Sequence, residues 1–146
     1  MASSSLLHPV HPALAHFPVA FWLGSSASDL IALKSGNSVW WAVSHYAVAA
    51  GVIVGAIALL AGAVELWLRK LPPEAWRWAG VHAGLMSTAL LCFMVSLSWR
   101  AAVPPPLSAV WVSLLGSAIV VAGGFCGGTL VYGYGVGVSW RAERRE

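Results

Sequence analysis

Four stretches of this chain contain no aspartate, glutamate, lysine or arginine, and each is long enough to cross a lipid bilayer. They cover residues 1–28, 35–64, 78–99 and 101–140. A helix needs about 20 largely apolar residues to span the hydrocarbon core. Charged residues make up only 9% of the chain, against about 25% in soluble domains. The pattern predicts a single all-α transmembrane domain, residues 1–146, with spans near 13–33, 41–67, 76–99 and 108–133.

The basic residues are unevenly divided between the two sides of this predicted bundle. Six lie on one side, at Arg69, Lys70, Arg77, Arg141, Arg144 and Arg145, and two lie on the other, at Lys34 and Arg100. Because lysine and arginine accumulate on the cytoplasmic side of membrane proteins, we expect an antiparallel four-helix bundle with both termini in the cytoplasm. Eight of the nine tryptophans fall near predicted span ends, and Trp22 is the exception.

Glycines recur at a spacing of four residues in two of the predicted spans. The steps are Gly51/Gly55, Gly123/Gly127 and Gly124/Gly128. Small residues at this spacing let helices approach closely in a membrane. The glycines therefore favour close helix packing, and the alternative is that Gly124 and Gly128 offer a flat surface to a bound cofactor.

Ionisable residues inside a span are costly and mark functional sites or buried pairs. In the antiparallel arrangement, His16, Glu65 and His82 lie at one depth near the predicted cytoplasmic face. Asp29 and His45 lie at one depth near the opposite face, with Arg100 just beyond the third span, so these residues could meet. We expect Asp29 and His45 to form a structural polar pair.

The group near the cytoplasmic face has several interpretations. His16 and His82 could be the two axial ligands of a b-type haem, whose potential such ligands set, with Glu65 orienting one imidazole. His11, His16, Glu65 and His82 could instead hold a metal ion or relay protons. The structural alternative is a hydrogen bond between Glu65 and a histidine that ties helices together, because an unpaired polar group in lipid is expensive.

Several motifs together resemble one bacterial family of predicted membrane proteins, domain of unknown function 2231. They are HPALAHFPVAFWLGSSASDL, the acidic Glu65, His82–Ala83 and GGTLVYGYGVGV. The matching positions are His11, Pro12, His16, Phe17, Pro18, Asp29, Glu65, His82, Gly127, Gly128, Leu130, Val131, Tyr132, Gly135, Val136, Gly137 and Val138. The resemblance covers residues 8–138. It implies a multi-pass domain of four spans in the bacterial inner membrane, often found with redox modules, and it supplies no activity.

Three functions follow from these features. The first is an electron-transfer subunit that holds haem b or works with quinone. The second is a non-catalytic accessory subunit of a larger respiratory or photosynthetic complex, and the third is a small transporter of metal ions or protons. Neither GxSxG, HExxH nor a P-loop is present, which favours a protein that is not an enzyme by itself. Expected partners are the lipid bilayer and other membrane subunits or a second copy, and no basic stripe suggests nucleic acid.

Overall fold

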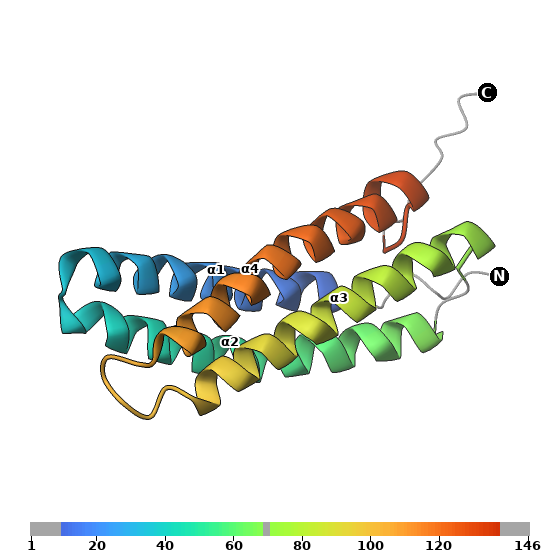
Figure 1. Cartoon of the computed structure of the whole chain (residues 1–146). Coiled ribbons are helices and arrows are strands. Elements are labelled where there is room, and N and C mark those ends of the chain that lie inside the picture. Colours follow the sequence, from blue (N-terminus) through green and yellow to red (C-terminus); the bar gives the residue numbers. More distant parts are fainter. Residues whose placement is uncertain (1–9, 69–70, 138–146) are drawn as a thin grey trace, which may run out of the picture.

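The structure, a computed structural model that describes residues 10–68 and 71–137, is a bundle of antiparallel helices (Figure 1). The helices are α1 (Val10–Ser35), α2 (Ser38–Leu68), α3 (Pro73–Ser98) and α4 (Leu107–Gly128), and a short π-helix, η1 (Thr129–Gly133), extends α4. The predicted all-α four-helix architecture is confirmed. Each helix begins and ends within a few residues of its predicted span, and α1 begins early enough to include His11.

Three segments are long and apolar enough to cross a membrane: α2, α3, and α4 together with η1. The first helix is not among these candidates, so three of the four predicted spans are supported and the span over α1 stays a prediction. The reason lies in the composition of α1, which carries Ser25, Ser26, Ser28 and Asp29. All four side chains are buried inside the bundle. The polar side chains that make α1 less apolar therefore face the other helices.

The bundle consists of two helical hairpins that cross at an angle (Figure 1). α1 packs mainly along α2, and α3 packs mainly along α4, with fewer contacts between the two hairpins. Gly36 makes the turn between α1 and α2 with a φ of 68°, a conformation that glycine adopts without steric cost. We call the end of the bundle where α1 begins, α2 ends, α3 begins and η1 ends the terminal end. The opposite end, where α1 turns into α2 and α3 leads into α4, is the closed end.

The indole of Trp22 fills the space that the glycines of α2 leave open. A Cβ atom built on Gly51 would lie 2.5 Å from this ring, and one on Gly55 would lie 2.6 Å from it. On its other side the indole stacks on Phe93, with ring centroids 4.9 Å apart. The glycine step in α2 therefore serves close packing, as predicted, and Trp22 lies away from the span ends because it is part of the core.

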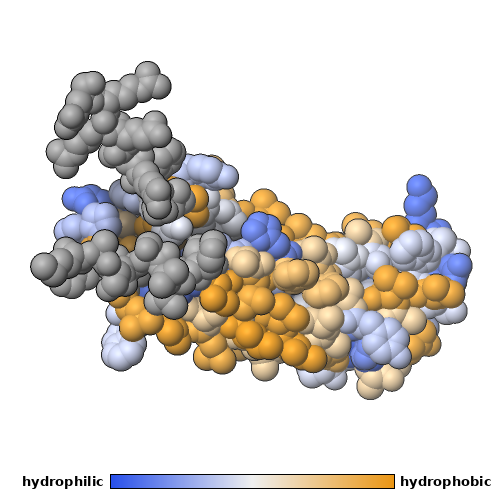
Figure 2. All heavy atoms as spheres, turned by 180° about the vertical axis from the view of Figure 1, so that it is seen from behind, coloured by the Kyte–Doolittle hydropathy of each residue, from blue (hydrophilic) through white to orange (hydrophobic). Residues whose placement is uncertain are grey.

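The outer surface of the bundle is apolar between its two ends. Ile53, Leu60, Leu91, Leu115 and Val121 are all exposed, and Figure 2 shows hydrophobic residues gathered over the middle of one face. Apolar patches of this extent are unusual on soluble monomers and mark contact with a membrane or a partner. Their position on spanning helices suits contact with lipid.

Candidate functional site

Two imidazoles from different hairpins meet near the terminal end of the bundle. His11 lies in the first turn of α1, and His82 lies in α3. Their ring centroids are 6.1 Å apart, and the ring planes are inclined by 79°. This histidine pair, His11 and His82, is the candidate functional site.

Each imidazole of the histidine pair is anchored to the backbone of the neighbouring helix in its own hairpin. Nδ1 of His11 donates to the carbonyl oxygen of Ala58 at 2.7 Å, and Nδ1 of His82 donates to that of Gly123 at 2.8 Å. A carbonyl oxygen only accepts hydrogen bonds, so Nδ1 carries the proton in both rings. In a neutral imidazole this leaves the lone pair on Nε2, the atom through which histidine commonly binds metals.

Glycines give the two rings their places against the helices. A Cβ atom on Gly62 would lie 2.9 Å from Nδ1 of His11, and one on Gly127 would lie 3.0 Å from Cε1 of His82. Both distances are too short for ordinary packing, so any larger residue would displace the imidazole. The glycine step Gly123/Gly127 thus belongs to the site. Gly124, in contrast, is exposed with nothing near its would-be Cβ, and Gly128 meets only a ring atom of Tyr132 at 4.0 Å.

Glu65 supports the start of α1 at the same site. Its Oε1 accepts a hydrogen bond of 2.9 Å from the backbone N–H of His11. The first N–H groups of a helix have no partner within the helix, and a carboxylate there also suits the helix dipole. Glu65 therefore fixes where α1 begins, and with it the position of the His11 ring.

In the structure His82 lies beside His11, whereas the predicted depth of the residues had paired it with His16. The side chain of His16 is exposed, whereas His11 is partly buried beside His82. His11 and His16 are five residues apart, which places them about 140° apart around a helix. Of the four residues His11, His16, Glu65 and His82, three come together. No group of three or more His, Cys, Asp or Glu side chains within residues 10–68 and 71–137 is arranged to hold a metal ion.

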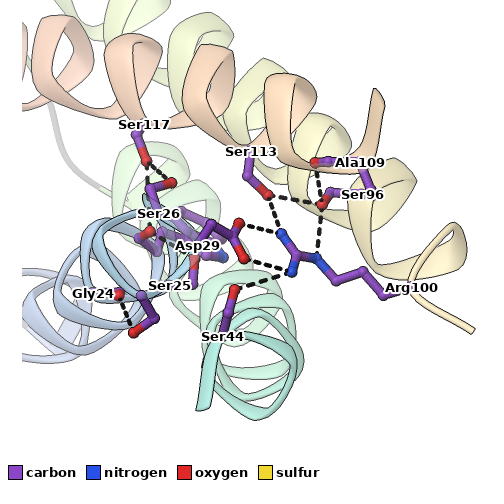
Figure 3. A network of polar contacts seen from close by, with 12 residues as sticks. Gly24, Ser25, Ser26, Asp29, Ser44, Ser96, Arg100, Ala109, Ser113 and Ser117 are labelled. Carbon is purple, nitrogen blue, oxygen red and sulfur yellow. Dashed lines mark hydrogen bonds and ion pairs between the residues drawn. The ribbon is translucent and has the colours of Figure 1, made fainter. Parts of the chain in front are cut away.

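A second polar site lies toward the closed end and centres on Arg100 (Figure 3). Its Nη1 donates to Oδ1 of Asp29 at 2.9 Å and to Ser44 at 3.0 Å. Its Nη2 donates to Oδ2 of Asp29 and, at 3.0 Å, to Ser113, while Nε donates to Ser96 at 3.1 Å. These acceptors come from α1, α2, α3 and α4. We call these five residues the arginine clamp.

The arginine clamp is a closed network. All five N–H donors of a guanidinium are used in it, and the Asp29 carboxylate is fully buried. No donor is left over for a substrate, so the network acts as a structural clamp. Asp29 therefore has Arg100 as its partner in place of the predicted His45, which is half-buried and lies edge-on to the ring of Tyr46.

Sequence comparison gives one clear relationship. A family profile described as "Predicted membrane protein (DUF2231)" matches residues 7–140. The match includes the histidine pair and the whole arginine clamp. No curated protein and no solved structure matches this chain. Because the profile covers nearly all of the sequence, the chain belongs to the family of predicted membrane proteins known as domain of unknown function 2231.

Proposed function

We propose that this chain is an electron-transfer subunit of the bacterial inner membrane that holds one b-type haem between His11 and His82. The observation that carries the proposal is the histidine pair itself. The two imidazoles come from different hairpins, approach each other at 6.1 Å, and are each fixed through Nδ1. The Nε2 atoms remain to bind iron.

The spacing of the two rings supports a shared metal centre. An imidazole nitrogen binds a metal at about 2 Å. Each nitrogen lies about 1 Å from the centre of its ring, so two imidazoles that shared one metal would have centroids roughly 6 Å apart. The observed centroid distance is 6.1 Å, so no large movement of either helix is needed to set the ring spacing.

The number of ligands favours haem over a bare metal ion. Structural zinc takes four ligands, and catalytic zinc takes three from the protein. Within the described residues no group of three suitable side chains exists. A haem iron takes its equatorial ligands from the macrocycle and needs only two from the protein. Haem held by two imidazoles would supply one-electron exchange at a potential set by these ligands and their surroundings.

The remaining residues of the site hold and orient the two rings. The carbonyls of Ala58 and Gly123 fix the imidazole orientation and raise the basicity of the nitrogen that would bind iron. Gly62 and Gly127 leave room for the rings against the helices. Because the two histidines come from different hairpins, a haem held by both would lie at the interface between the hairpins.

An absorption spectrum tests the proposal directly. Protein expressed with adequate haem supply and purified in mild detergent should show a Soret band, with sharp α and β bands after dithionite reduction. The band should be lost, or weakened at least tenfold, in His11→Ala and in His82→Ala. His16→Ala is the matched control, because His16 lies on the same helix with its side chain exposed, and its spectrum should equal that of the wild type.

Two results would contradict the proposal. One is wild-type protein without any Soret band after haem supplementation, which would favour the accessory-subunit alternative. The other is loss of the band in His16→Ala together with its retention in His11→Ala. Circular dichroism on each variant separates loss of haem from loss of helical structure.

A further inference from the structure

A pocket opens at the first turn of α3, at the terminal end of the bundle. It has a volume of about 430 Å³ and is lined by Pro73, Glu74, Arg77, Trp78 and Tyr134. Pro73, Glu74 and Arg77 are exposed, so the pocket is an open depression in the surface. Tryptophan and tyrosine prefer the level of the lipid headgroups, so these lining residues place the pocket where a membrane meets water.

The aromatic wall of this α3 pocket is held by the core of the bundle. Trp78 and Tyr134 both pack against a buried cluster of Ala75, Ala79 and Leu130. Tyr134 is brought there by the chain reversal after η1, where Gly135 has a φ of 64° and the backbone N–H of Val136 donates to the carbonyl of Leu130 at 2.9 Å. The wall therefore has a defined position independent of any ligand.

The α3 pocket also carries one cation and one anion. Arg77 and Glu74 are three residues apart on α3, so they lie on neighbouring positions of one helix face. Both are exposed. In the described part of the chain neither side chain makes a hydrogen bond or an ion pair, with the other or with a third residue. The pocket thus presents two opposite charges, neither with a partner among residues 10–68 and 71–137, beside two aromatic rings.

We propose that the α3 pocket binds the headgroup of phosphatidylethanolamine. The guanidinium of Arg77 fits the phosphate, to which arginine donates in a bidentate manner. The carboxylate of Glu74 fits the primary ammonium, which carries three donors. A zwitterionic headgroup with its two charges joined by two carbons matches both unpaired side chains at once.

The charge pattern also sets the selectivity among lipids. Phosphatidylglycerol has the phosphate but no ammonium, and it would leave Glu74 facing an anion. Phosphatidylcholine has a quaternary ammonium, which has no N–H to donate to the carboxylate. The pocket is therefore expected to prefer phosphatidylethanolamine, although basic sites at this membrane face more often select anionic lipids.

Native mass spectrometry of the full chain released from nanodiscs tests this preference. The discs contain equal parts of the ethanolamine, glycerol and choline lipids. The wild type should retain the ethanolamine lipid about tenfold more than either of the others, the ratio that about 1.4 kcal/mol produces. Free phosphoethanolamine, added without its acyl chains, should displace the retained lipid only weakly, whereas displacement as efficient as by the lipid would show a soluble ligand and overturn the lipid assignment.

Two variants separate the charges of the pocket. Glu74→Gln should remove the preference for ethanolamine over glycerol lipid, and Arg77→Gln should lower retention of both. Lys34→Gln, which removes an exposed cation at the closed end, is the matched control and should retain lipid as the wild type does. Preference for phosphatidylglycerol in the wild type would overturn the proposal, as would equal retention in Glu74→Gln, Arg77→Gln and wild type. A thermal unfolding midpoint equal to that of the wild type shows that each variant folds.

Discussion

Replacing Arg100 with methionine tests the arginine clamp most severely. Arg100 is 4% exposed and Asp29 is 0% exposed. In Arg100→Met the Asp29 carboxylate would lose both of its bonds to the guanidinium, and Ser44 would lose its bond as well. Removing one partner of a buried ion pair costs about 3–5 kcal/mol, because the other charge stays buried without compensation. We expect the free energy of unfolding to fall by this amount.

A second substitution separates the cost of the orphaned charge from the loss of packing. In the double variant Asp29→Leu/Arg100→Met both charges are gone, and buried ion pairs replaced by apolar residues are often neutral in stability. Ser96 would still donate to the carbonyl of Ala109 and contact Ser113. The double variant should therefore be more stable than Arg100→Met by at least about 2 kcal/mol, although it differs from the wild type at one more position.

Reversible unfolding in mixed micelles with increasing dodecyl sulfate measures these differences. Lys34→Met is the control, since it removes an exposed cation from the same end and should change the free energy of unfolding by less than about 0.5 kcal/mol. A change below about 1 kcal/mol in Arg100→Met, or a double variant less stable than the single one, would refute the assignment of Arg100 as the compensating charge.

Three further stability predictions follow from the packing and are checked by the same unfolding measurement. Gly55→Leu should destabilise the bundle by about 1–3 kcal/mol because the new side chain would overlap the indole of Trp22. Gly124→Leu should be near neutral, because nothing lies within 4 Å of a Cβ atom at that position. Equal effects of the two substitutions would contradict the packing. Gly36→Ala should cost about 1–2 kcal/mol because its φ is positive, and a neutral effect would count against that turn. Ser117→Ala should cost about 1 kcal/mol through its lost hydrogen bond to Ser26, and an increase in stability would argue against the bond.

The level of a residue along the bundle axis was predictable from the sequence. The direction in which its side chain points around the helix was not. Uncharged runs located the helices, and antiparallel order placed His16, Glu65 and His82 at one depth, whereas the structure brings Glu65 and His82 together with His11. The choice between His11 and His16 depends on the rotation of α1, which is set by the packing of Trp22 into the glycines of α2. The nearly uniform apolarity of the spans gives little indication of that rotation.

The partner of Asp29 shows a different limit of sequence reasoning. Arg100 follows the last residue of α3, Ser98, within a turn, so its position suggests a residue at the membrane surface. The long side chain reaches back into the bundle instead, where Asp29 and the serine hydroxyls satisfy all of its donors. The signal in the sequence was the serine content of the four helices, because clustered hydroxyls inside spans supply acceptors for a buried cation.

The contrast between the two polar sites gives them different roles. In the arginine clamp every donor is used and all four helices are joined, so the closed end is a fixed point of the bundle. In the histidine pair the Nδ1 atoms are bonded to backbone, whereas no hydrogen bond within the described residues involves either Nε2. The clamp thus joins the helices at the closed end, whereas the histidine pair, toward the terminal end, keeps two nitrogens without a hydrogen bond among the described residues.

The most direct test of the proposed haem site is chemical rescue of His11→Gly, followed by electron paramagnetic resonance. Oxidised wild-type protein should give the low-spin signal of iron with two axial imidazoles. His11→Gly should give a high-spin signal or lose haem, and millimolar imidazole should restore the low-spin signal by filling the space of the missing ring. A low-spin signal in His11→Gly that is unchanged without imidazole, or wild-type protein that binds no haem, would contradict the proposed site.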